Sequence, residues 1–106
     1  MKQLKIANFF GEANQIIKAH EELDETTEAL EDYCNNQNVD TLKHVLNEAY
    51  DLVNVLEGLY LQKGGCLMEI ASEKEFKLCK TESIINKIPS DAKDKVAAYD
   101  KIRYGG

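Results

Sequence analysis

The sequence has little of several features that define familiar protein classes. Proline occurs once, at Pro89, and no low-complexity linker interrupts the chain. No apolar run approaches the roughly 18 residues of a membrane span, and the N-terminus has no signal-peptide core. We therefore expect a cytoplasmic protein with no membrane partner.

Cysteine is also scarce, and it is not arranged for a disulfide framework. The three cysteines, Cys34, Cys66 and Cys79, form no CxxC pair, and an odd count favours reduced thiols. No zinc-ligand spacing joins these thiols to His20 or His44. The cysteines therefore agree with an intracellular location and do not predict a zinc site.

An excess of positive charge is missing as well. The formal net charge is −6, and no basic footprint occurs before the last third of the chain, which argues against a nucleic-acid polymer as partner. A cation, or a small anion carried with a cation, fits this charge better. The length of 106 residues, with 43% hydrophobic and 30% charged residues, predicts one soluble globular domain over 1–106.

Strand-like alternation is absent, and apolar residues recur at helical spacing. We predict a first helical segment over 2–34 with a break near Gly11, and a loop at 35–40. A second helix should begin at a cap supplied by Asp40 or Thr41 and run to about Lys63, where Gly64 and Gly65 end it.

The rest of the chain also reads as helical. A third helix is expected from Cys66 to about Lys80, and the segment after Pro89 should form a last helix with Ser90 as its N-cap. The fold class is therefore all-α, with four to five helices.

The segment 19–34, AHEELDETTEALEDYC, is crowded with carboxylates. At about 100° per residue, one stripe of the helix contains Glu21, Glu25, Glu28 and Asp32, and Glu22 lies beside it on the margin of the apolar side. A solvated acidic face would cost only a few tenths of a kcal/mol per like-charged pair. The segment alone does not decide between that face and a cation site.

The second helix provides the deciding context. Its apolar arc is broad enough for burial by more than one neighbour, yet Glu48 stands inside the margin of that arc and Asp51 one step outside it. A carboxylate at such a margin costs several kcal/mol to desolvate unless it is paired or metal-bound. Lys43 lies on the other side of the helix, so a divalent cation is the better partner. Mg²⁺ prefers such oxygen ligands and keeps waters for a phosphate substrate.

At these residues the chain resembles the all-α nucleoside triphosphate pyrophosphohydrolases of the MazG-like group. EELDE (Glu21, Glu22, Glu25) followed by EAYD (Glu48, Asp51) matches the EExxE…ExxD signature of that family, and twenty-two residues separate Glu25 from Glu48. The lead-in NQIIKAHEE and the segment LNEAYDLVNVLEGLYLQ are similar to its two core helices. The resemblance covers roughly residues 12–62. Glu28, Glu31 and Asp32 lie outside the signature and are expected to be ordinary solvated acids.

The resemblance implies a helical bundle that binds Mg²⁺, with Mn²⁺ as a substitute, and converts a nucleoside triphosphate to the monophosphate and pyrophosphate. Glu22, Glu25, Glu48 and Asp51 match the metal ligands. Glu25 is our choice for the catalytic base that accepts a proton from water, and Glu21 matches a supporting acidic group.

The C-terminal third departs from the family pattern, which commonly supplies an asparagine and basic groups for phosphate. The segment SEKEFKLCKTE has no asparagine. The basic candidates for phosphate binding are Lys74, Lys77, Lys80, Lys101 and Arg103. An equally ordinary interpretation is a solvated basic strip on a surface helix.

The uniformly apolar stretch 42–60 predicts association with a second copy, as a homodimer or homotetramer, and the family implies the same. Two alternatives to the nucleotide pyrophosphohydrolase stay open. One is a phosphoribosyl-ATP pyrophosphohydrolase of related helical fold, and the other is a non-catalytic helical interaction module.

Overall fold

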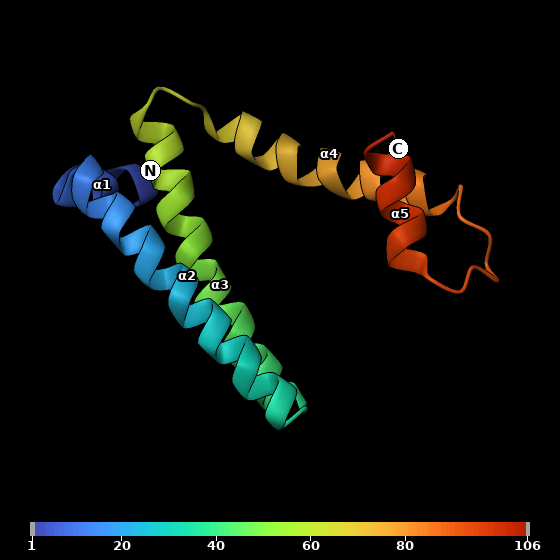
Figure 1. Cartoon of the computed structure of the whole chain (residues 1–106). Helices are drawn as coiled ribbons and strands as arrows, with labels where there is room; N and C mark the ends of the chain where they lie inside the picture. The colour runs from blue at the N-terminus through green and yellow to red at the C-terminus, as the bar shows by residue number, and fades with distance from the viewer. Residues whose placement is uncertain (1, 106) are drawn as a thin grey trace. The chain divides into compact units, whose positions relative to one another are not determined.

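A computed structural model describes residues 2–105, and over this range the chain forms five helices and no strand (Figure 1), which confirms the all-α prediction. The helices are α1 (Lys2–Phe10), α2 (Glu12–Asn35), α3 (Val39–Gln62), α4 (Leu67–Ile85) and α5 (Lys95–Arg103). They divide into two compact units, one that ends at Leu67 and one that begins at Met68. No described helix is long and apolar enough to cross a lipid bilayer.

The first unit is a helical hairpin with a short helix packed on it. Helices α2 and α3 run antiparallel and side by side, and α1 lies near the open end of this hairpin (Figure 1). The expected break falls at Gly11, whose φ of 85° is a conformation that side-chain-bearing residues rarely adopt. Glycine at this position therefore allows the chain to turn from α1 into α2.

Helix α1 is attached to α3 by side-chain hydrogen bonds and by a close backbone approach. Gln3 Nε2 donates to Asn54 Oδ1 at 3.0 Å, and Gln62 Nε2 donates to the Ala7 carbonyl at 3.1 Å. The approach occurs at Gly58, where an added Cβ would lie 3.1 Å from the Gln3 carbonyl oxygen and 3.3 Å from Ala7 Cβ. The missing side chain thus lets two helix backbones meet.

The hairpin loop is shorter than predicted. Helix α3 begins at Val39, and its N-cap is Asn38, so the predicted caps Asp40 and Thr41 were wrong. Asn38 Oδ1 accepts from the Thr41 backbone N–H at 3.0 Å, while the Thr41 hydroxyl accepts from the Asn38 N–H at 3.3 Å. These two bonds satisfy the backbone N–H groups of Asn38 and Thr41, which favours Asn38 as the N-cap, three residues before Thr41. Only three residues separate α2 from α3.

Few side chains are buried, and a row of apolar residues on α3 is only partly covered. The buried apolar residues are Ala7, Ala29, Val55, Leu61 and Ile84. The row, which we call the α3 stripe, consists of Leu42, Leu46, Ala49, Val53, Leu56 and Tyr60. Five of its six members are 41–49% exposed, with Ala49 half-buried. Their alternating spacing of four and three residues is the heptad spacing of helix–helix seams.

The second unit contains α4 from Met68 onward and α5. Helix α4 continues to Ile85, five residues beyond the predicted end at Lys80, because no breaking residue occurs before Pro89. The predicted cap Ser90 was wrong, since residues 89–92 form a turn and Asp94 caps α5 through its Oδ1, 3.0 Å from the Ala97 N–H.

Candidate metal centre

Three of the acids selected from the sequence meet between α2 and α3. Glu22 and Glu25 come from α2 and Glu48 comes from α3, and one carboxylate oxygen from each lies within 4.8 Å of the other two. We call these three residues the acid cluster. They meet because α2 and α3 pack antiparallel, so that the turn of α2 with Glu22 and Glu25 lies beside the turn of α3 with Glu48.

The members of the acid cluster differ in their contact with solvent. Glu22 is half-buried, and its Oε2 is shielded from solvent with no hydrogen-bond partner among residues 2–105. The Glu48 side chain is 20% exposed, in agreement with its predicted place at the margin of the apolar arc. Glu25 is exposed, so the cluster opens to water on the side of Glu25.

The electrostatics of the acid cluster favour a bound proton or a cation. Loss of hydration is the largest cause that raises the pKa of Glu22, followed by the charges of Glu25 and Asp51. Loss of hydration also leads the causes that raise the pKa of Glu48, followed by the contact with Glu25. No lysine or arginine in the described part of the chain forms an ion pair with these carboxylates.

Asp51 and Glu21 lie outside the acid cluster. Asp51 is exposed on α3, one turn from Glu48, and its negative charge contributes to the raised pKa of both Glu22 and Glu48. Its charge is therefore near enough to raise both pKa values, but its carboxylate is not among the three whose oxygens lie within 4.8 Å of one another. Glu21 is exposed on α2.

A groove of about 240 Å³ continues from the acid cluster along the hairpin. Its lining residues are Glu25, Glu28, Ala29, Asp32, His44 and Glu48. Glu28 and Asp32 are exposed, as predicted for solvated acids, yet they share a groove with the cluster. The sequence signal for their position in this groove was the helical stripe that Glu28 and Asp32 share with Glu25.

His44 is the residue that sequence reasoning missed. Its Nε2 lies 3.9 Å from Glu48 Oε1. The positive charge of a protonated His44 lowers the pKa of Glu48, whereas the loss of hydration and the neighbouring carboxylates raise it. The i,i+4 spacing of His44 and Glu48 was the available signal, because residues four apart face each other on a helix.

The donor set of the acid cluster fits a hard divalent cation. All of its potential ligands are carboxylate oxygens, which Mg²⁺ and Mn²⁺ prefer, and the shielded Glu22 oxygen lacks any other partner in the described range. Three carboxylates leave coordination positions for water or phosphate oxygens. The geometry is thus compatible with metal-assisted chemistry on a phosphate ester or anhydride.

The basic residues selected for phosphate binding belong to the second unit. Lys74, Lys77 and Lys80 are exposed on α4, and Lys101 and Arg103 occupy the last turn of α5. The Arg103 guanidinium carbon lies 5.1 Å from the ring centroid of Tyr104. Their role in phosphate binding stays a prediction.

The chain matches no family model, no curated protein and no solved structure.

Proposed function

We propose that this protein is a Mg²⁺-dependent nucleotide pyrophosphohydrolase that converts a nucleoside or deoxynucleoside triphosphate to the monophosphate and pyrophosphate. The observation that carries the proposal is the acid cluster, in which two antiparallel helices hold three carboxylates together with no lysine or arginine of residues 2–105 paired to them. The EExxE…ExxD order that contains these residues supports the choice of reaction. Removal of unwanted nucleotides from the cellular pool is the role that we assign to it.

The metal set in this proposal is Glu22, Glu25, Glu48 and Asp51. Mg²⁺ supplies neutralisation of the phosphate charges when it is bound. The half-buried carboxylates of Glu22 and Glu48 hold the deeper positions, since their loss of hydration is offset by a cation. Asp51 completes the set from the solvent side.

Glu25 has the exposure that a general base needs. It is the exposed member of the acid cluster, and one of its carboxylate oxygens lies within 4.8 Å of those of Glu22 and Glu48. It accepts a proton from a water whose oxygen attacks the α-phosphorus, and the bond from that phosphorus to the α,β-bridging oxygen breaks, which releases pyrophosphate. Glu21, which is also exposed on α2, is the supporting acid of this site, either as a further ligand or as a group beside the ligands.

Self-association belongs to the same proposal. The α3 stripe has heptad spacing and is exposed over most of its length, which are the properties of a helix seam that a partner helix covers. We assign that position to a second copy of the chain, as a homodimer or a homotetramer. Lys74, Lys77, Lys80, Lys101 and Arg103 are the groups that we assign to phosphate binding.

A panel of canonical and modified triphosphates, incubated with the protein and Mg²⁺ and assayed for pyrophosphate, tests the proposal. Release that disappears in Glu48→Gln and persists in Glu31→Gln supports the enzyme, because Glu31 is an exposed acid outside both the cluster and its groove. Silence from every substrate, phosphoribosyl-ATP included, removes the enzyme and leaves the helical interaction module.

A further inference from the structure

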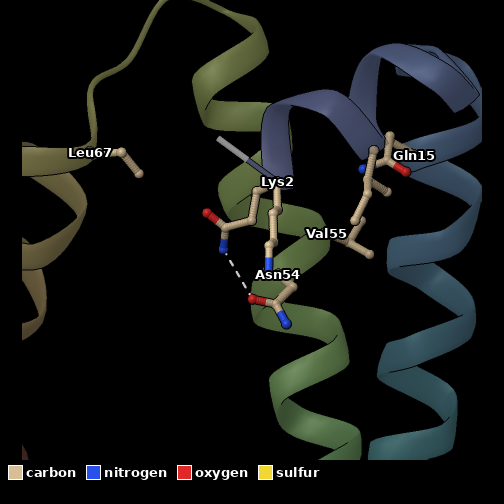
Figure 2. Close-up of a pocket in the computed structure, with 7 residues that line it drawn as sticks. Lys2, Gln15, Asn54, Val55 and Leu67 are labelled. Atoms are coloured by element: carbon tan, nitrogen blue, oxygen red, sulfur yellow. Dashed lines mark hydrogen bonds between the residues drawn. The ribbon is translucent and has the colours of Figure 1, made fainter.

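A second cavity of about 540 Å³ lies in the first unit, on the α1 side of the hairpin. We call it the α1–α3 pocket. Its lining residues are Lys2, Gln3, Ile6, Gln15, Asn54, Val55 and Leu67. Figure 2 shows Asn54 and Val55 reaching it from α3, with Lys2 on α1 beside them. Its volume is in the range of small-molecule sites.

The position of this pocket relates it to the proposed metal site. Val55 follows Glu48 by seven residues on α3, and Gln15 precedes Glu22 by seven residues on α2, so both lie about two turns, or roughly 10 Å, from the acid cluster. Residues at these spacings share a helix face. A molecule with its phosphates at the acid cluster would therefore have its other end near the pocket.

The side chains around the pocket suit a flat heterocycle. Ile6 and Val55 supply apolar walls. At the rim, Gln3 Nε2 uses both hydrogens, one donated to Asn54 Oδ1 at 3.0 Å and one to Glu57 Oε1 at 2.9 Å. These bonds orient the amides and leave Gln3 Oε1 as acceptor and Asn54 Nδ2 as donor, without partners within residues 2–105. An acceptor beside a donor complements the edge of a nucleobase.

Gln15, which also lines the pocket, provides one more polar group. It is 1% exposed, and its Oε1 has no hydrogen-bond partner among the described residues. Buried acceptors are normally satisfied, so an N–H group of a ligand that reaches this oxygen would complete it.

We propose that the α1–α3 pocket binds the nucleobase of the substrate, with the Asn54 and Gln3 amides on the edge of the base and Ile6 and Val55 on its faces. This inference rests on the proposed function, and it names the part of the chain that selects the nucleotide. Asn54 contacts substrate in this scheme and takes no part in bond breaking, so its loss should act on KM more than on kcat.

Nucleosides test the pocket without metal and without catalysis. The probes are adenosine, guanosine, cytidine and thymidine at millimolar concentration, with ribose 5-phosphate as the control that lacks a base. We expect at least one nucleoside to shift the NMR signals of the Asn54 side-chain amide and the Val55 N–H, while ribose 5-phosphate leaves them in place.

Two variants and a matched control complete the experiment. Asn54→Ala removes the donor and should weaken nucleoside binding, and raise KM for a hydrolysed triphosphate, by about tenfold. Ile6→Trp fills the pocket without removing a polar group and should do the same. Asn47 is an exposed asparagine of α3 that does not line the pocket, so Asn47→Ala should leave the nucleoside affinity and the KM unchanged.

The outcomes separate this proposal from the one on which it rests. Nucleoside shifts at Asn54 without hydrolysis of any triphosphate would uphold the pocket and overturn the hydrolase. Hydrolysis with no nucleoside shift, and with KM unchanged in Asn54→Ala and Ile6→Trp, would overturn the pocket alone. Circular dichroism confirms that each variant is folded before it is compared.

Discussion

A carboxylate oxygen of Glu22 on α2 lies within 4.8 Å of a carboxylate oxygen of Glu48 on α3, although both side chains have lost part of their hydration. Two partly desolvated like charges at this distance destabilise the folded chain unless a proton or a cation joins them. This relationship makes the hairpin sensitive to metal and to pH, and both effects are measurable.

Glu48→Gln should lower the affinity for Mg²⁺ by about tenfold or more, because the substitution removes one of three clustered ligands and keeps the shape of the side chain. Isothermal titration calorimetry with Mg²⁺ and with Mn²⁺ measures the change. Glu31→Gln should bind like the unmodified chain. Equal affinity in all three proteins would contradict the assignment of the metal site.

The metal-free chain should lose stability as the pH rises above about 4.5, the ordinary pKa of its glutamates. Glu22 and Glu48 have raised pKa values when folded, so the folded state binds more protons than the unfolded state between the ordinary and the raised values. The resulting loss in the free energy of unfolding is complete above the raised pKa values. Urea unfolding of the metal-free chain at pH 4.5 and at pH 7 measures this loss.

Two comparisons identify the groups responsible for this pH dependence. Glu22→Gln should flatten the decline in the free energy of unfolding, since the substituted side chain does not ionise. Saturating Mg²⁺ at pH 7 should restore stability to the unmodified chain, because a ligand that binds only the folded state stabilises it. A metal-free chain that becomes more stable from pH 4.5 to 7 would count against this origin.

Leu46→Lys should weaken self-association through the α3 stripe. Leu46 is 49% exposed, so covering its exposed half contributes about half of the roughly 1.5–3 kcal/mol that full burial of a leucine gives, and in a homodimer the substitution removes this from both copies. We expect the dissociation constant measured by analytical ultracentrifugation to rise at least about tenfold. Asn47→Lys adds the same charge next to the stripe and should have little effect. A monomeric unmodified chain at micromolar concentration would refute the assembly.

Asn38→Ala should destabilise the hairpin by about 1 kcal/mol, because the N-cap of α3 loses the acceptor for the Thr41 backbone N–H. Thermal and urea unfolding give the difference. Asn36→Ala is the matched control, since only the backbone carbonyl of Asn36 accepts the bonds from this cap. Equal destabilisation by both substitutions would indicate a general effect of the loop.

The fold class could be predicted because it depended on a regular period, and the break at Gly11 because glycine weakens helix interiors. Helical spacing placed Glu22 and Glu48 on the margins of apolar faces and Glu25 in the acidic stripe beside Glu22, and the EExxE…ExxD resemblance grouped these acids across the two helices. The cap at Asn38 could not be chosen in advance, because Asn38, Asp40 and Thr41 all cap helices well and the reciprocal bonds decided among them.

The environment of the site was less predictable than its members. The α1–α3 pocket depends on how α1 turns back at Gly11 and on the close approach at Gly58, neither of which leaves a periodic signal. Ser90 was chosen as a cap from its residue type alone, whereas the turn at 89–92 delays the helix until Asp94 can cap it.

The three-residue link between α2 and α3 has a consequence for how the chain tolerates insertions and deletions. Residues added to this loop would lengthen an exposed tip and leave the register of the hairpin intact, since loop closure costs little more as a loop grows. One residue added between Glu22 and Glu25 would instead rotate the following acids by about 100° around α2. The spacing within each helix is therefore fixed by the site, and the length of the loop between them is free to vary.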